Sequence, residues 1–258
     1  MRKIVSDLTI VENVALNANY FLLKLTSDQK LPDMFPGQFV ELKVENSPST
    51  FLRRPISINF IDENSNQMWL LIQIVGEGTR KLSLLQTGET LNMMFPLGNS
   101  FTMPSGGSKS VLLVGGGVGT APMLFFGKQL KENGITPNFL LGARSEKDLL
   151  QLDEFSKFGN LYTTTEDGSA GEKGYVTQHS ILQNQKFDFI YTCGPKPMMV
   201  AVASYAKRNA IECEVSLENT MACGFGVCLC CVENTVNGNV CVCTEGPVFN
   251  INELTWQI

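Results

Sequence analysis

The sequence lacks the features of a protein that crosses a membrane, is exported or tracks along a nucleic acid. Its most apolar window, residues 111–126, is interrupted by four glycines and is shorter than the ~20 apolar residues that span a bilayer. Near the N-terminus, charged and polar residues stand where a secretory signal would need an unbroken apolar stretch. The sequence has no run of Lys or Arg that could bind along a phosphate backbone, and its net charge is -5. We therefore expect a cytoplasmic protein without membrane or nucleic acid partners.

The length and the first third of the chain predict a β domain followed by a second domain. A chain of 258 residues corresponds to about two domains, because one domain averages roughly 150 residues. Short segments rich in Val, Ile and Phe alternate apolar and polar residues between turns, which is typical of antiparallel strands with one buried face. We expect a sandwich or barrel with one helix near residues 79–85. The expected strands cover residues 8–14, 20–25, 38–44, 56–61 and 68–75.

The sequence pattern changes after a Pro-, Gly- and Ser-rich stretch at residues 102–108, which is the best linker candidate. Apolar strands now alternate with helical patterns, which predicts an α/β domain whose parallel sheet carries helices on both faces. The only histidine, His179, lies in one of these helices, where a surface or core role is favoured over catalysis. The expected strands cover residues 111–114, 138–142, 160–164, 188–192 and 212–217, and the expected helices cover residues 121–133, 146–155, 176–183 and 197–209.

Two features of the first domain suit an anionic ligand. Arg54 stands before Pro55 in an expected strand and can hold a phosphate with its forked guanidinium, while Ser57 can hydrogen-bond a polar ring edge. A helix that starts at Gly78 and Thr79 offers amide groups to an anion. The alternatives without a ligand are an edge strand with solvated arginines and a helix that Thr79 only caps. Together the two features predict a diphosphate clamp.

Two turns of the second domain are placed to hold a dinucleotide. The first leads from an apolar strand into a helix, and its glycines let a pyrophosphate approach the backbone. Its residues are Gly115, Gly116, Gly117, Gly119 and Thr120. The spacing departs from G-x-G-x-x-G, so tight packing is an equal alternative. The second turn, at Cys193, Gly194 and Pro195, lies at the carboxyl edge where α/β sheets bind ligands. Cys193 there either faces a nicotinamide ring or is a small buried residue.

The C-terminal segment carries the most specific pattern of the chain. Its candidate metal ligands are Cys223, Cys228, Cys231 and Cys243. The first three follow a C-x4-C-x2-C spacing, which holds plant-type [2Fe–2S] clusters. A zinc site is disfavoured because the second cysteine pair is only C-x-C, and disulfides would need an oxidising compartment. Cys230 and Cys241 are expected to point away, although either can substitute for a neighbouring ligand.

Taken together, the motifs resemble those of a known family. They are R-R-P-I-S-I, G-E-G-T, P-L-G-N, G-G-G-V-G-T-A-P, Y-T-C-G-P and M-A-C-G-F-G-V-C-L-C-C-V followed by C-T-E-G-P-V-F. This series, which runs over nearly the whole chain, is similar to the electron transfer subunits of dihydroorotate dehydrogenase B in the ferredoxin reductase superfamily. The resemblance implies a FAD-binding β-barrel domain over residues 1–102, an NAD-binding α/β domain over residues 108–217 and a [2Fe–2S] module over residues 218–258.

The resemblance also implies which residues hold each cofactor. The cluster would be held by the four cysteines named above, and NAD would lie at the two turns of the second domain. FAD would be bound by Arg54, Pro55, Ile56, Ser57, Leu71, Ile72, Gln73, Gly78 and Thr79.

The implied activity is an oxidoreductase reaction shared between two kinds of chain. An FMN-containing partner would oxidise dihydroorotate in pyrimidine biosynthesis, and two copies of each chain would form a heterotetramer. This chain would pass the electrons to NAD+, with FAD linking the one-electron chemistry of the cluster to the two-electron chemistry of hydride. The sequence supplies no evident base for dihydroorotate oxidation, so the chain alone is not expected to make orotate.

Departures from the family pattern leave alternatives open. Phe95 stands where similar sequences often have glycine, and Cys230 where a small non-ligand is usual. Arg144 and Ser145 suit a 2′-phosphate, so the preference for NAD over NADP comes from the resemblance alone. Similar reductase subunits also serve sulfide dehydrogenase, hydrogenase or transhydrogenase complexes. An alternative of another class is a non-catalytic, zinc-bearing nucleotide sensor.

Overall fold

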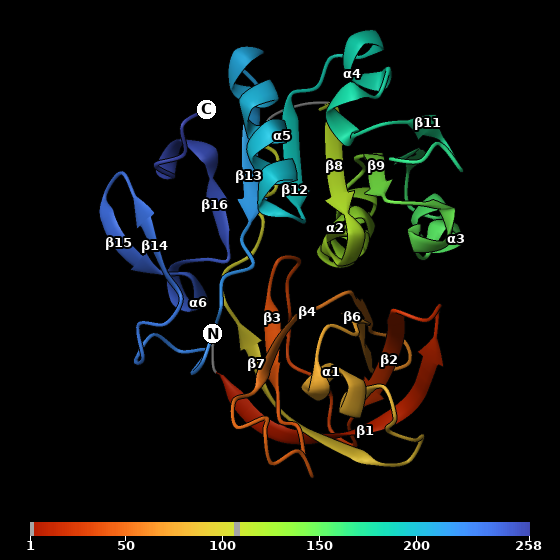
Figure 1. Ribbon diagram of the computed structural model, residues 1–258, viewed down its shortest axis with the longest axis vertical. Coiled ribbons are helices and arrows are strands. Elements are labelled where there is room, and N and C mark those ends of the chain that lie inside the picture. Colours follow the sequence, from red (N-terminus) through yellow and green to blue (C-terminus); the bar gives the residue numbers. More distant parts are fainter. Residues whose placement is uncertain (1–2, 106–108) are drawn as a thin grey trace.

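The computed structural model describes residues 3–105 and 109–258 and arranges them around two seven-stranded sheets (Figure 1). In the view of Figure 1 the first sheet lies below the second, and the C-terminal segment lies beside both. Residues 106–108, which end the expected linker and include the expected start of the second domain, lie outside the described residues.

The first sheet is antiparallel and curls into a half-barrel. Its strands are β1 (Ile4–Ala15), β2 (Tyr20–Thr26), β3 (Phe39–Leu42), β4 (Arg54–Ser57), β5 (Phe60–Asp62), β6 (Gln67–Gln73) and β7 (Thr90–Leu97), with helix α1 (Glu77–Leu82) before the last strand. In the order β4-β3-β7-β1-β2-β6-β5, the two edge strands are consecutive in the chain. Between them, the amide of Ile58 donates to the Gln38 oxygen (3.0 Å) and that of Asn59 to the Trp69 oxygen (2.9 Å). One segment therefore joins both edges, and the predicted antiparallel barrel is confirmed.

Two expectations for this sheet need correction. Residues 56–61 form two strands, because the chain passes there from its partner β3 to its partner β6. Strand β7 was not expected, yet it pairs with both β1 and β3. Its sequence, T-L-N-M-M-F-P-L, contains a proline, which weakens the sequence signal of an inner strand.

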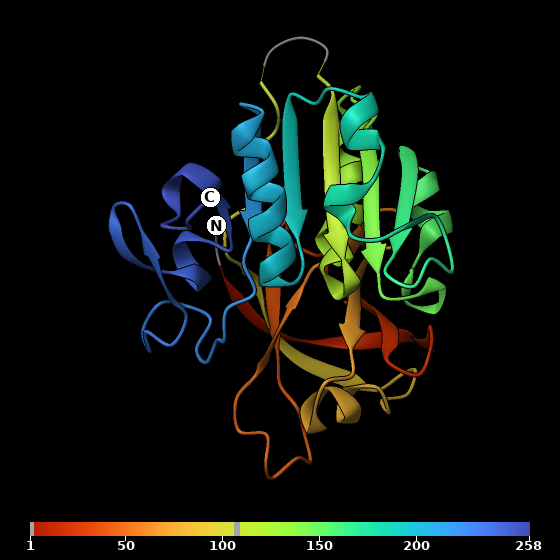
Figure 2. The same cartoon turned by 45° about the horizontal axis from the view of Figure 1, so that its top comes forward.

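The second sheet is a parallel sheet with helices on both faces, as predicted. Its parallel core consists of β8 (Val111–Gly116), β9 (Asn138–Ala143), β10 (Asn160–Thr165), β12 (Phe189–Cys193) and β13 (Glu212–Ser216). The edge strands are β11 (Glu172–Lys173) and β16 (Val248–Asn250), of which β16 runs antiparallel to β13. Helices α2 (Ala121–Glu132) and α3 (Leu152–Ser156) cover one face, and α4 (Ile181–Asn184) and α5 (Lys196–Arg208) cover the other (Figure 2). Across residues 3–105 and 109–258, no helix combines the length and apolarity that a bilayer crossing requires.

Two expected helices of this half are interrupted. The pattern over residues 146–155 yields a short 3-10 turn and α3, because Gln151 between them has a left-handed backbone (φ 55°). The pattern over residues 176–183 yields another 3-10 turn and α4, separated by an extended His179. The His179 side chain is buried, and its Nδ1 accepts a hydrogen bond from the Ile181 amide (3.1 Å). The sequence favoured a surface or core role over catalysis, and the structure shows the core position.

The C-terminal segment packs against both sheets. It forms the hairpin β14 (Val232–Thr235) and β15 (Gly238–Cys241), helix α6 (Val242–Glu245) and then β16. Cys243 and Phe249 share one apolar cluster with Phe39 and Leu97 of the first sheet and Val215 of the second. The segment expected to carry the iron–sulfur cluster is therefore anchored to both parts of the fold.

Candidate functional site

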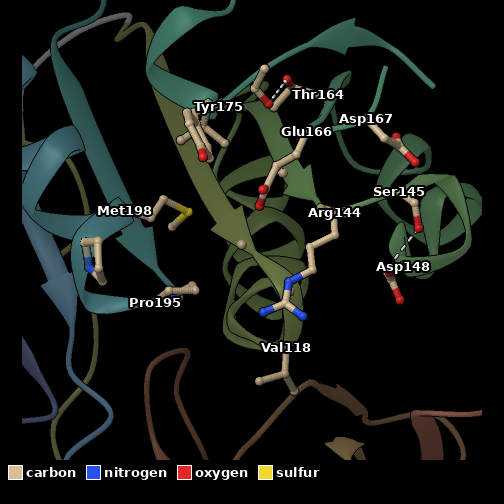
Figure 3. A pocket seen from close by; sticks show the side chains of 18 of the residues that line it. Val118, Arg144, Ser145, Asp148, Thr164, Glu166, Asp167, Tyr175, Pro195 and Met198 are labelled. Carbon is tan, nitrogen blue, oxygen red and sulfur yellow. Dashed lines mark hydrogen bonds between the residues drawn. The ribbon is translucent and has the colours of Figure 1, made fainter. Parts of the chain in front are cut away.

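A cavity of about 940 Å³ lies at the carboxyl edge of the parallel sheet and faces the half-barrel (Figure 3). Both predicted turns reach its wall, through Gly116 and Gly117 at the end of β8 and through Gly194 and Pro195 after β12. The barrel contributes Tyr20, Asn19 and Gln73. Because ligands of open α/β sheets bind outside the carboxyl ends of the strands, this cavity is the candidate dinucleotide site.

The glycines of the first turn divide into two groups. A Cβ on Gly119 would lie 2.4 Å from Gly194 Cα, and a Cβ on Gly115 would lie 2.8 Å from the Thr120 side chain. These two glycines therefore allow close packing behind the cavity. Gly117 is open instead, because its backbone is left-handed (φ +56°) and only the Tyr20 hydroxyl would lie within 4 Å of an added Cβ. The sequence offered packing and ligand approach as alternatives, and the turn has the geometry for both.

Cys193 lies behind the cavity wall. Its side chain is fully buried, and its Sγ lies 3.9 Å from Oε1 of Glu218, which does line the cavity. Burial raises the pKa of both the Cys193 thiol and the Glu218 carboxyl. Cys193 is therefore a protonated, buried thiol and not a nucleophile, and Glu218 is the member of the pair that faces the cavity.

Charged residues of both signs gather on the side of the cavity formed after β9 and β10. Arg144 and Ser145 lie there as the sequence suggested, and the Ser145 hydroxyl donates to Oδ2 of Asp148 (3.0 Å; Figure 3). Glu166 and Asp167 complete this wall. A 2′-phosphate near Arg144 would therefore also meet carboxylates, whereas a 2′-hydroxyl could donate to them. Sequence reasoning missed the three acidic residues because two sequence-distant loops meet here.

The residues expected to hold FAD lie on the half-barrel. A Cβ on Gly78 would lie 3.4 Å from Arg54 Cδ, so the structure brings these two predicted residues together. The Arg54 guanidinium donates to the main-chain oxygens of Leu52 (2.9 Å) and Arg53 (3.0 Å) and takes part in none of the ion pairs of the described residues. Its charge is available to an anion. The pair therefore fits the diphosphate of a flavin nucleotide.

Other predicted FAD residues have restricted side chains. Leu71 and Ile72 are buried in apolar clusters, so only their main chain can reach a ligand. The Thr79 hydroxyl accepts hydrogen bonds from the amides of Val75 (2.9 Å) and Gly76 (3.2 Å), which is the capping role offered as the alternative. Pro55, Ile56 and Ser57 are half-buried in β4. These ligand assignments remain predictions.

The four candidate cluster cysteines lie in the loop after β13 and in helix α6, where they contact one another in pairs. The amide of Gly226 donates to Cys243 Sγ (3.1 Å), and the amide of Cys243 donates to Cys231 Sγ (3.4 Å). Burial raises the pKa of Cys223, but amides of the loop and the Cys228 side chain outweigh it and lower that pKa to about 6. Amides directed at thiolate sulfurs are the interactions that tune iron–sulfur clusters. The donor set therefore fits a thiolate-held cluster.

The contacts among these cysteines are pairwise. Within the part of the chain that the structure describes, no three His, Cys, Asp or Glu side chains are preassembled around a single metal ion. Cys230 is exposed, whereas burial raises the pKa of the Cys241 thiol and the Cys231 thiol raises it further. The Cys241 Sγ lies 4.0 Å from the Gly226 oxygen, and the expectation that Cys230 and Cys241 point away from the cluster stays a prediction.

The cluster loop rests directly on the half-barrel. Gly224 has a left-handed backbone (φ +72°), and a Cβ on it would lie 2.9 Å from Glu41 Cγ and 3.1 Å from the Leu97 and Met94 side chains. Glu41 is fully buried beneath this loop, and both of its carboxylate oxygens lack a hydrogen-bond partner among the described residues. Burial raises the pKa of Glu41 to about 7, against the lowering effect of two arginines.

Replacing Gly224 by alanine should displace the cluster loop. The new Cβ would press against side chains of β3 and β7. The backbone strain of a left-handed alanine costs about 1–2 kcal/mol more. The matched control is Gly238→Ala, because Gly238 is also left-handed (φ +104°) but has no atom within 4 Å. We expect iron content to fall severalfold in Gly224→Ala alone. Equal iron in both variants would show that the close approach to the barrel does not matter.

Comparisons with known proteins agree with this arrangement. The family profile described as the iron-sulfur cluster binding domain of dihydroorotate dehydrogenase B matches residues 218–255, and the oxidoreductase NAD-binding domain matches residues 113–204. The dihydroorotate dehydrogenase B (NAD(+)) electron transfer subunit of Shouchella clausii is 37% identical over 260 residues, which cover 98% of this chain and 99% of that protein. The corresponding subunit of Fusobacterium nucleatum is 36% identical over 252 residues, which cover 95% and 96%.

Solved structures give the same result for the fold. The structure of an NADH-dependent reduced ferredoxin-NADP oxidoreductase superimposes with a TM-score of 0.85 at 30% identity and covers 96% of this chain and 90% of that one. The ferredoxin reductase of carbazole 1,9a-dioxygenase, with a TM-score of 0.65 at 20% identity over 81% of this chain and 65% of that one, supports the fold alone. From its full-length relatives, the chain belongs to the family of dihydroorotate dehydrogenase B (NAD(+)) electron transfer subunits.

Proposed function

We propose that this chain carries electrons from a dihydroorotate-oxidising partner to NAD+ in pyrimidine biosynthesis. One observation carries the proposal. Glu41, beneath the cluster loop, is the direct cross-strand partner of Pro55 in the expected FAD-binding strand. Neighbouring strands lie about 4.8 Å apart, so the strand beneath the cluster loop and the expected FAD-binding strand are one strand spacing apart. This closeness suits the passage of single electrons between them.

The chain's own residues have distinct tasks in this function. Arg54 supplies a free cation for the FAD diphosphate, and the cysteines of the loop hold the [2Fe–2S] cluster. When bound, FAD exchanges either one or two electrons and so links a cluster to a nicotinamide. The cavity after β8 and β12 binds NAD through its two turns. These tasks correspond to three units over residues 1–102, 108–217 and 218–258.

The partner is an FMN-containing catalytic subunit, assembled with this chain as two copies of each. The division of labour rests on the relatives, whose name, electron transfer subunit, implies a separate catalytic subunit. All eight cysteines are free, as suits the reducing cytoplasm, where thiols and thiolate-held metals persist.

The division of labour predicts a clear difference between the single chain and the complex. The purified chain, loaded with FAD and cluster, should reduce a dye with NADH and form no orotate from dihydroorotate. Adding the FMN-containing subunit should restore orotate formation coupled to NAD+ reduction, measured from the absorbance of both products. Orotate formation by the single chain would contradict the proposal.

A second candidate keeps the cofactors and changes the partner. The 30% identity to the NADH-dependent ferredoxin-NADP oxidoreductase favours a reductase subunit of a transhydrogenase-like complex. Native co-purification separates the two, because recovery with a hydrogenase or ferredoxin-linked subunit would exclude the pyrimidine role.

The zinc-bearing sensor is tested by the visible spectrum, since flavin and iron–sulfur absorb there and zinc does not.

A further inference from the structure

One hydroxyl on the wall of the dinucleotide cavity has no hydrogen-bond partner among the described residues. Tyr20 begins β2 of the half-barrel and is only 6% exposed. Its ring packs in one apolar cluster with Leu71 of the barrel and with Val118 and Ala121 of the glycine turn and helix that follow β8. The hydroxyl forms no hydrogen bond with any described residue, although the residue lines the cavity. A polar group in this position needs a partner from solvent or from a ligand.

The open space beside this hydroxyl is the approach to the glycine turn. A Cβ on Gly117 would lie 3.7 Å from the Tyr20 oxygen and within 4 Å of nothing else. A ligand that passes close to the Gly117 backbone must therefore pass beside the Tyr20 hydroxyl. Tyr20 itself is held in place across the two halves, since its amide donates to Asn17 Oδ1 (3.1 Å) and the Asn17 side chain donates to the Lys147 oxygen (2.6 Å).

The electrostatic surroundings keep the hydroxyl protonated. Burial raises the pKa of Tyr20, Asp148 raises it further, and Arg144 opposes them. The group is therefore a hydrogen-bond donor at neutral pH. The acceptor that gains most from such a donor is an ionised oxygen, because hydrogen bonds to charged groups are about twice as strong as neutral ones.

We propose that Tyr20 is a binding residue for NAD, donating its hydroxyl hydrogen to a diphosphate oxygen of the dinucleotide above Gly117. The inference rests on the proposed function and adds a residue from the half-barrel to the site of the other sheet. FAD also contains a diphosphate, and Tyr20 is the cross-strand partner of Gln73 in the barrel, but the Tyr20 hydroxyl lies beside Gly117 in the turn after β8 of the second sheet. Bound NAD is thereby held between the two halves of the molecule.

The test uses Tyr20→Phe in the complete complex with its cofactors bound. Calorimetric titration should show NAD+ and ADP binding about tenfold more weakly, the effect of losing one hydrogen bond to a charged group, while adenosine, which has no diphosphate, binds as before. The KM for NADH should rise by a similar factor with kcat unchanged. Flavin content and thermal stability should match the wild type, because the hydroxyl has no partner in the part of the protein that the structure describes.

The matched control is Tyr205→Phe. The Tyr205 hydroxyl donates to the Leu182 oxygen (2.7 Å) away from the cavity, so this variant should lose stability and keep its affinity for NAD+. Wild-type NAD+ affinity in Tyr20→Phe would overturn the assignment while leaving the proposed function intact. Loss of FAD with unchanged NAD+ affinity would overturn it too, since the hydroxyl would then serve the flavin. If the wild type itself bound no NAD+, the proposed function would fail first.

Discussion

Cys228→Ser is expected to abolish electron flow from dihydroorotate to NAD+ while sparing NADH-dependent dye reduction. Cys228 is exposed in the cluster loop, and its side chain contributes to the low pKa of Cys223. Altering a residue that only hydrogen-bonds a metal ligand already lowers metal affinity about 10–100-fold, so removing a ligand should exceed that range. We expect iron and acid-labile sulfide to be lost and coupled activity to fall more than about 100-fold.

The control for this prediction is Cys230→Ser. Cys230 is also exposed in the same loop, two residues further on, and no ligand role is assigned to it. This variant should keep its iron, its visible spectrum and its coupled activity. If both variants retained iron equally, Cys228 would not be a ligand, and if only Cys230→Ser lost it, the ligand set would have to shift by two positions.

Gly119→Ala should be the most damaging substitution in the dinucleotide site. The added Cβ would lie 2.4 Å from Gly194 Cα and 2.5 Å from the Cys193 carbonyl carbon, which are backbone atoms that cannot rotate away. Overpacking of this kind typically costs about 1–3 kcal/mol, and we expect the upper end. Both turns that face NAD would move apart, so the KM for NADH should also rise.

The control is Gly134→Ala, in the same half of the molecule. Gly134 follows α2 with a left-handed backbone (φ +79°), and no atom lies within 4 Å of an added Cβ. The Gly134→Ala variant should lose only about 1–2 kcal/mol of stability, which is the cost of a left-handed alanine, and should keep its KM for NADH. Thermal unfolding and steady-state kinetics of both variants decide the matter, and equal KM values would mean that contact between the two turns does not position the coenzyme.

The regular elements of this fold could be predicted because their signals are local. Strands β8, β9 and β12 of the second sheet are short and largely apolar, and α2 and α5 have continuous helical patterns. Strand β7 and edge strand β16 were missed, since both depend on partners far away in the chain. The break at Gln151 was missed because a left-handed glutamine has no sequence signature.

The candidate site was predictable to a smaller extent. The cysteine spacing and the two glycine turns are visible in the sequence because each lies within one loop. Tyr20 and Glu41 are not, because their surroundings form only when separate elements pack together. Alternation in F-V-E-L-K-V places Glu41 outside the barrel, and the structure agrees, but the loop at Gly224 then covers it. No local pattern reports that burial.

The central claim is that the four C-terminal cysteines hold a [2Fe–2S] cluster beside the flavin. The most direct measurement is the iron, acid-labile sulfide, zinc and FAD content of the native complex, isolated without oxygen. We expect about two irons, two labile sulfides and one FAD per chain, as the cluster type requires. A complex with zinc in place of iron, or with neither iron nor labile sulfide, would contradict the account.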